Sequence, residues 1–176
     1  MTDSKISKLK GFMPKHEGTA LTKWSEEFSS IGPIMEIGSY CGKSAMYLSK
    51  GAILNDQLVY TIDHHFGSEE HQINEEYFDN EIFDYKNQRV NTLPLLIKNI
   101  NKMQVENIVP IISNSVVIAS NWNTELGMVF IDGGHSFKAA NDDYESWSTK
   151  IKQNGALVIH DIFENPNEGG QAPFEI

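Results

Sequence analysis

The sequence predicts an α/β fold built on a doubly wound, mainly parallel sheet, and two observations carry this prediction. The first is a series of short apolar runs, each ending in small or acidic residues, as is typical of buried parallel strands. The second is that segments with helical spacing of apolar residues separate these runs, and such alternation builds right-handed βαβ units. We therefore expect a Rossmann-like sheet with five strands, at residues 34–37, 58–62, 108–112, 128–131 and 156–159.

A helix is expected ahead of the first strand. Leu21, Trp24 and Phe28 recur at helical spacing, which predicts an amphipathic helix that covers one edge of the fold. A chain of 176 residues has room for one hydrophobic core rather than two. We therefore expect an N-terminal helical segment over residues 1–32 and a single ligand-binding domain over residues 33–176.

Composition narrows the classes of function. The chain has 24 acidic and 14 basic residues and a formal charge of −10, so its surface repels nucleic acid and anionic lipid. The single cysteine, Cys41, cannot form an internal disulfide, and no apolar run approaches the ~20 residues that span a bilayer. Residues 1–10 lack the apolar core of a secretory signal. These features favour a cytoplasmic protein without a nucleic-acid or membrane partner.

The link between the second and third strands is longer than one crossover helix requires. Ligands of open parallel sheets bind at the carboxyl ends of the strands, where the strand order reverses. We therefore interpret this link as an insertion near the ligand site. It carries four aromatic residues among acidic ones: Tyr77, Phe78, Phe83 and Tyr85.

A glycine-containing turn follows the first strand. Glu36 precedes this turn, which contains Gly38, Ser39, Tyr40 and Gly42. Glycines allow a tight turn and let a ligand approach the backbone before the next helix begins. The turn lacks the full Gly-x-Gly-x-x-Gly spacing of dinucleotide-binding proteins, and similar turns occur in folds that bind no nucleotide.

The ends of the second and third strands add to this pattern. Asp63 ends the second strand, 25 residues after Gly38, where an acidic side chain can accept hydrogen bonds from both hydroxyls of a ribose. The turn and Asp63 together favour an adenosine-containing ligand, although Glu36 and Asp63 could instead only cap strand and helix ends. Asn114 and Ser115 follow the third strand, and they suit contact with an adenine edge as well as they suit capping of the next helix.

The last two strands each end in a carboxylate and a histidine. Asp132 and His135 follow the fourth strand, and His160 and Asp161 follow the fifth. A single carboxylate at such a position is usually a helix cap, but two on adjacent strands can share a divalent cation. Oxygen ligands favour magnesium or calcium, whereas histidine ligands favour manganese, iron or zinc.

These motifs together resemble those of the class I S-adenosylmethionine-dependent methyltransferases, from about residue 34 to the end of the chain. The resemblance is closest to a bacterial branch with an Asp-Gly-x-His-Ser signature after the fourth strand, related to metal-dependent O-methyltransferases of small molecules. Residues 64–71 also resemble that branch. The matching motifs are Glu36-x-Gly38-Ser39-x-x-Gly42, Ile62-Asp63, residues 131–136 and His160-Asp161.

The resemblance implies that S-adenosylmethionine is the cofactor and that it lies over residues 38–42. Glu36 or Asp63 would hold its ribose, and its adenine would lie near Asn114 and Ser115. The implied activity is transfer of the methyl group to a small-molecule acceptor, at an oxygen atom.

The resemblance also implies a metal, although many enzymes with this fold need none. In metal-dependent relatives, carboxylates at the positions of Asp132 and Asp161 hold the cation, and His160 lies beside them in this sequence. Mg²⁺ or another divalent cation is the implied ion, and it would lower the pKa of an acceptor hydroxyl.

Methyl transfer from a sulfonium needs no covalent intermediate, so catalysis reduces to alignment of the acceptor and removal of its proton. His135 is our first candidate for the base, and His64 and His65 are the others. We also expect His64 and Asp132 to contact the cofactor.

Two other functions compete with methyl transfer. One is a nicotinamide-dependent oxidoreductase built on the same kind of sheet, for which the glycine fingerprint is incomplete. The other is a non-catalytic domain of methyltransferase fold that binds the nucleoside.

The C-terminal end departs from the family pattern. Family members continue after the fifth strand into a helix and an antiparallel strand pair, whereas this chain ends at Ile176, fifteen residues past Asp161. We expect the antiparallel pair to be missing and the strand at 156–159 to be an exposed apolar edge. The chain would then either associate through that edge, as in a homo-oligomer, or be a truncated, weakly stable version of a longer enzyme.

Overall fold

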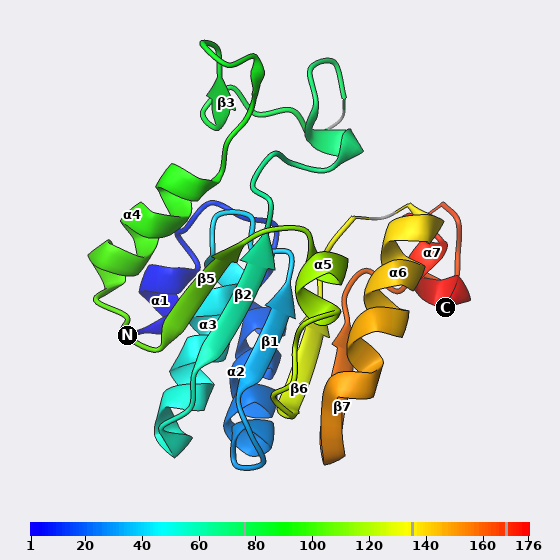
Figure 1. Cartoon of the computed structure of the whole chain (residues 1–176). Helices are drawn as coiled ribbons and strands as arrows, with labels where there is room; N and C mark the ends of the chain where they lie inside the picture. The colour runs from blue at the N-terminus through cyan, green and yellow to red at the C-terminus, as the bar shows by residue number, and fades with distance from the viewer. Residues whose placement is uncertain (76, 135, 168) are drawn as a thin grey trace.

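A five-stranded parallel sheet forms the centre of the computed structural model, which describes residues 1–75, 77–134, 136–167 and 169–176 (Figure 1). The strand order is β5-β2-β1-β6-β7, and every pairing is parallel. The predicted doubly wound α/β fold is confirmed, and each predicted run overlaps one strand. The strands are β1 (Ile34–Ile37), β2 (Val59–Asp63), β5 (Ile108–Ile112), β6 (Leu126–Ile131) and β7 (Ile151–Ile159).

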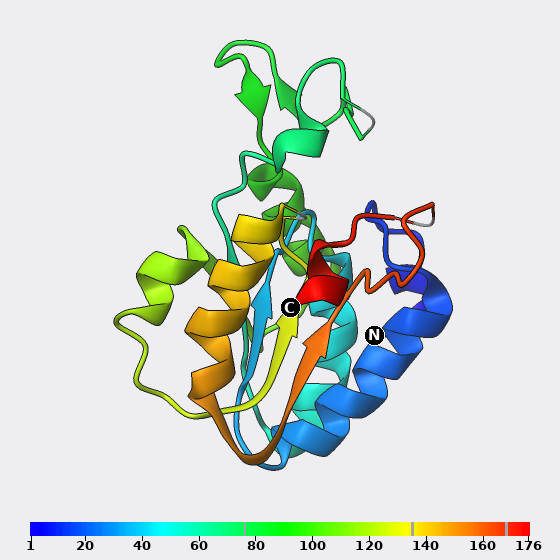
Figure 2. The ribbon, with the colours of Figure 1, turned by 90° about the vertical axis from the view of Figure 1, so that its right-hand side faces the viewer.

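Helices cover both faces of this sheet (Figure 2). On one face, α1 to α4 pack over a core that includes Met46 and Phe130, and on the other face α5 and α6 pack over a core that includes Trp147. The helices are α1 (Asp3–Ile6), α2 (Lys15–Ser29), α3 (Lys43–Ala52), α4 (Leu93–Met103), α5 (Ser115–Ala119), α6 (Phe137–Trp147) and α7 (Ala172–Glu175). No helix in the described ranges is both long and apolar enough to cross a membrane.

The strand order reverses next to β1. From β1 the chain builds outward through β2 to β5, and it then returns to the other side of β1 to add β6 and β7. A crevice opens at the carboxyl ends of the strands where such a reversal occurs. The ligand site is therefore expected between the ends of β1 and β6.

Helix α2 lies on a face of the sheet, against α3, β1 and β6, and not over an edge as we expected. The reason is a very close approach of α2 to α3. A Cβ atom on Gly51 would lie 2.2 Å from the carbonyl oxygen of Thr22, and one on Gly18 would lie 2.2 Å from the Tyr47 ring. Ser25 Oγ donates a hydrogen bond to the backbone of α3 across this interface.

The expected insertion occupies residues 64–92, and it rises beyond the carboxyl ends of the strands (Figure 1). It contains the short helix η2 (Glu69–His71) and a small antiparallel hairpin of β3 (Phe83–Asp84) and β4 (Arg89–Val90). Buried Ile82 and Val90 pack with Cys41 and attach the insertion to the glycine-containing turn.

Strand β7 is an edge strand, as predicted, because within the described ranges only β6 pairs with it. Residues 156–159 are half-buried rather than exposed, because their side chains pack alternately into the two cores. An irregularity in the pairing with β6 separates them from Ile151, and Asn154 lies within it at a φ of 69°.

We predict that Gly51→Ala destabilises the fold although alanine is the better helix former. The gain in helix propensity is about 1 kcal/mol, whereas the new methyl group must displace the backbone of α2, and overpacking of this kind costs about 1–3 kcal/mol. At 2.2 Å from a backbone oxygen the cost lies at the upper end of that range, so the net loss is about 2 kcal/mol. We expect the melting temperature to fall by roughly 4–8 °C, measured by circular dichroism. Lys23→Ala, at an exposed position of α2, is the control. An unchanged or raised melting temperature for Gly51→Ala would show that the interface is looser than the structure indicates.

Candidate functional site

A cavity of about 680 Å³ opens at the carboxyl ends of the strands, at the expected place. Its volume lies within the range of small-molecule sites. The loops after all five strands line it, together with the N-terminal segment and the insertion. The cavity-lining residues that we had predicted are Gly38, Ser39, Tyr40, Asp63, His64, Asn114, Ser115, Asp132, His160 and Asp161.

The turn after β1 is held against the end of β6. Gly38 has a φ of 97° and Gly42 a φ of 84°, a region that side chains rarely adopt. A Cβ atom on Gly38 would lie only 2.0 Å from the carbonyl oxygen of Asp132. We expected glycine at this position because a ligand would approach the backbone there. In the structure it is the backbone of Asp132 that leaves no room for a side chain at Gly38.

Glu36 lies beneath this turn and does not line the cavity. Thr61 Oγ1 donates a hydrogen bond to Glu36 Oε2 and contacts the Ser39 hydroxyl, whereas Glu36 Oε1 has no hydrogen-bond partner within the described residues. Burial raises the pKa of Glu36 to about 8. This position suits support of the turn better than direct contact with a ribose.

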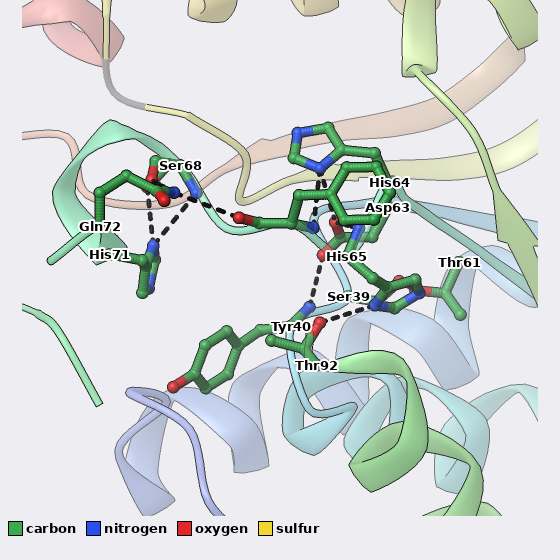
Figure 3. Close-up of polar contacts among 11 residues, drawn as sticks. Ser39, Tyr40, Thr61, Asp63, His64, His65, Ser68, His71, Gln72 and Thr92 are labelled. Carbon is green, nitrogen blue, oxygen red and sulfur yellow. Dashed lines mark hydrogen bonds and ion pairs between the residues drawn. The ribbon is translucent and has the colours of Figure 1, made fainter. Parts of the chain in front are cut away.

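Asp63 connects the turn to the insertion (Figure 3). Its Oδ2 accepts a hydrogen bond from the backbone N–H of Tyr40 at 2.8 Å, and its Oδ1 accepts one from the N–H of His65 at 2.6 Å. The side chain is 17% exposed and lines the cavity. Asp63 therefore fixes two loops while its carboxylate still faces the space where a ligand would lie.

The loop after β5 caps a helix, which was one of the two interpretations we had left open. Asn114 Oδ1 accepts hydrogen bonds from the N–H groups of Val116 and Val117, at 3.0 and 3.2 Å. Ser115 Oγ donates to the carboxylate of Asp143, whose pKa is raised by burial. Asn114 and Ser115 also line the cavity, so capping does not prevent contact with a ligand.

The ends of β6 and β7 bring Asp132, His160 and Asp161 together, as their sequence positions predicted. One potential ligand atom from each lies within 4.8 Å of the others. His160 Nδ1 lies 3.2 Å from Asp132 Oδ1 and 3.1 Å from Asp161 Oδ1, but it is aligned for a hydrogen bond with neither.

A fourth residue, Glu17 of α2, joins this cluster, and sequence analysis missed it. Glu17 Oε2 lies 2.8 Å from His160 Nε2. Burial alone would lower the pKa of His160, but the carboxylates of Asp132, Asp161 and Glu17 outweigh this and raise it to about 11. The contact joins residues 143 positions apart, so no local pattern could have indicated it.

The candidate bases differ in their access to the cavity. His64 lines the cavity, and its Nδ1 accepts a hydrogen bond from the N–H of Phe66 at 3.0 Å. His65 is 1% exposed, lies outside the lining and bonds Thr92 Oγ1 through Nδ1, and burial lowers its pKa. His135 lies outside the described residues.

An aromatic cluster closes the side of the cavity near the insertion. Phe12 of the N-terminal segment has its ring centroid 5.5 Å from that of Tyr40 and 5.3 Å from that of Tyr77. His71 lies 5.3 Å from Tyr40, measured in the same way. All four line the cavity, so three separate segments of the chain supply this wall.

The cavity is rich in carboxylates. Glu17, Asp63, Asp132 and Asp161 line it, and the lysines in the described lining are Lys43 and Lys138. Lys43 Nζ donates a hydrogen bond to the carbonyl of Gly11, and burial lowers the pKa of Lys43. Such a site favours ligands that carry positive charge near the carboxylates.

A family model described as a methyltransferase domain matches residues 35–162, which is more than half of the chain. The chain belongs to this methyltransferase family. The match includes the turn after β1, Asp63 and the cluster of Asp132, His160 and Asp161. The prediction of a methyltransferase is therefore confirmed.

Solved structures share the methyltransferase fold at low sequence identity. Cofactor-bound Rv0187 from MTB aligns at a TM-score of 0.64 and 12% identity, over 98% of this chain and 72% of its own. SAH-bound PaMTH1, a methyltransferase of Podospora anserina, aligns at a TM-score of 0.57 and 14% identity, over 98% of this chain and 81% of its own. TomG, an O-methyltransferase of Streptomyces achromogenes in complex with SAM, aligns at a TM-score of 0.60 and 15% identity, over 93% of this chain and 67% of its own.

We predict that Gly38→Ala disrupts the methyltransferase domain even without a ligand. The new Cβ atom would meet a backbone carbonyl in an unfavourable φ region, so the strain of about 1–3 kcal/mol adds to a clash that only separation of β1 from β6 can relieve. We expect a loss of more than about 3 kcal/mol in urea unfolding. Gly134→Ala is the control, because its Cβ would meet Ala139 at an ordinary 3.4 Å. Equal stabilities of the two variants would contradict this account of the turn.

Proposed function

We propose that this methyltransferase transfers the methyl group of S-adenosylmethionine to an oxygen atom of a small-molecule acceptor. The observation that carries the proposal is the position of Asp63, whose carboxylate is fixed by the turn after β1 and faces a cavity at the reversal of strand order. Pairing of an acidic side chain with that turn is how open α/β sheets hold a ribose.

The residues of the cavity fit this cofactor. Each oxygen of Asp63 already accepts one backbone N–H, and a carboxylate oxygen has a second lone pair that can accept a ribose hydroxyl. The carboxylate-rich lining suits a ligand with sulfonium and ammonium charges. When bound, the cofactor supplies an electrophilic methyl group on sulfur.

The same features weigh against the two rival functions. A nicotinamide dinucleotide carries a pyrophosphate, which the carboxylates of this cavity would repel and which needs a glycine fingerprint that the turn lacks. A domain that only bound the nucleoside would have no use for Asp132, His160 and Asp161 at the far side of the cavity.

A divalent cation fits the cluster at the ends of β6 and β7. Asp132, His160 and Asp161 offer two carboxylates and an imidazole nitrogen, and that nitrogen is buried and faces both carboxylates without a well-aligned hydrogen bond among the described residues. Asp132, Asp161 and His160 Nδ1 would hold the cation, which would lower the pKa of an acceptor hydroxyl.

We place the acceptor between this cluster and the aromatic wall of Phe12, Tyr40 and Tyr77, which supplies apolar surface for binding. His135 remains the proposed base. His64 is less suited, because an Nδ1 that accepts the N–H of Phe66 leaves the ring proton on Nε2 and no free lone pair.

The cofactor part of the proposal is tested by calorimetric titration with S-adenosylhomocysteine. We expect binding to the unmodified chain and a loss of at least about tenfold in Asp63→Asn, since a hydrogen bond to a charged group contributes about 1.5–3 kcal/mol. Asp56→Asn, at an exposed carboxylate outside the cavity lining, is the control and should bind normally. Absence of binding to the folded, unmodified chain would refute the proposal, and tighter binding of NAD would favour the oxidoreductase.

The metal part is tested by removal of the ion and of one ligand. We expect methylation of hydroxylated acceptors, followed with labelled cofactor, to stop after exhaustive chelation and to return when a divalent cation is added. Asp161→Asn should reduce turnover by at least about 100-fold and leave the affinity for S-adenosylhomocysteine within about twofold. The reason is that Asp161 would hold the cation that activates the acceptor, and would not hold the cofactor. Full activity after chelation would refute the metal.

A further inference from the structure

The Glu17 carboxylate is hydrogen-bonded to Nε2 of the His160 ring, and neither the fold nor the cofactor explains that contact. We propose that Glu17 positions His160 as a nitrogen ligand, and that the site therefore selects a first-row transition-metal ion over Mg²⁺ or Ca²⁺. This inference rests on the proposed metal site and concerns which ion that site takes.

The hydrogen bond to Glu17 decides which ring nitrogen can bind a cation. A carboxylate only accepts, so the Nε2 atom of His160, 2.8 Å from Glu17 Oε2, carries the hydrogen. Nδ1 is then the ring nitrogen left for a cation, which would take the place of the proton that the raised pKa of His160 keeps on Nδ1. A carboxylate behind a histidine is the usual arrangement that orients a metal-binding imidazole and raises its basicity.

Nδ1 is directed at the place where a cation would have its other ligands. It is buried and lies 3.2 Å from Asp132 Oδ1 and 3.1 Å from Asp161 Oδ1, and among the described residues it has no well-aligned hydrogen bond. A buried polar atom that lacks a well-aligned hydrogen bond calls for an explanation, and a cation held between the ring and the two carboxylates would supply one. Rotation of the ring could improve the alignment, but it would break the bond to Glu17.

The donor set determines the class of ion. Mg²⁺ and Ca²⁺ prefer oxygen ligands, whereas imidazole nitrogen increases affinity for ions from manganese to zinc. Two carboxylates and one well-oriented imidazole therefore favour Co²⁺, Zn²⁺ or Mn²⁺. The preference depends on His160, and through His160 on Glu17.

Glu17 comes from outside the sheet, and its helix holds it there. It lies in the first turn of α2, directly before Gly18, where the ring of Tyr47 on α3 leaves no room for a side chain. The close packing of α2 on α3 therefore fixes the distance from Glu17 to the end of β7.

The test compares binding of Co²⁺ and Mg²⁺ to the whole chain. Calorimetry gives both affinities, and the visible absorption of Co²⁺ reports nitrogen coordination. We expect Co²⁺ to bind at least about tenfold more tightly than Mg²⁺, and Glu17→Ala to weaken Co²⁺ by about 10–100-fold with a much smaller effect on Mg²⁺. Glu17→Gln, which can still accept from Nε2, should retain part of the preference. Glu27→Ala, an exposed carboxylate of the same helix, should match the unmodified chain.

A double-mutant cycle assigns the effect to His160. In a His160→Ala background, Glu17→Ala should weaken Co²⁺ no further, because its effect passes through the ring. S-adenosylhomocysteine affinity and melting temperature, measured on every variant, show that the cavity remains folded.

The possible failures are distinguishable. If S-adenosylhomocysteine binds and neither ion does, the metal site is wrong and the cofactor site stands. If Mg²⁺ binds as tightly as Co²⁺, the selectivity is wrong. Glu17 is not a positioning residue for His160 if Glu17→Ala weakens the binding of both ions equally. The same holds if Glu17→Ala weakens the binding of Co²⁺ no more than Glu27→Ala does.

Discussion

The close approach of Gly38 to the carbonyl of Asp132 is the contact on which the site depends. It brings the turn after β1 against the end of β6, at the point where the strand order reverses. Because these strands are adjacent, the glycine-containing turn and the acidic cluster share one cavity. A side chain at Gly38 would separate the two halves of the site before it met any ligand.

Two acidic residues near this contact have opposite environments, and that difference separates their roles. Glu36 is fully buried, and burial raises its pKa to about 8, so it is suited to hydrogen bonds inside the protein. Asp63 is partly exposed, accepts two backbone N–H groups and lines the cavity. The sequence pattern alone left either residue free to hold a ribose, whereas burial favours Asp63.

Sequence analysis predicted the residues of the site that lie at or directly after the end of a single strand. Buried parallel strands are nearly continuous apolar runs, so their carboxyl ends, and with them Asp63, Asp132 and Asp161, could be located. Contacts that join distant segments left no such signal. The expected edge position of α2 was wrong because two glycines in helical patterns do not by themselves indicate a helix–helix interface. Glu17 was missed for the same reason.

The N-terminal segment, which we had assigned outside the ligand-binding domain, forms part of the cavity wall. Lys10 pairs with Asp79 of the insertion, and Glu17 reaches His160 at the end of β7. The segment therefore contacts opposite sides of the cavity, and its position is set by the packing of α2 on α3. The geometry around His160 thus depends on a helix–helix interface on one face of the sheet, because its hydrogen-bond partner Glu17 is carried by α2.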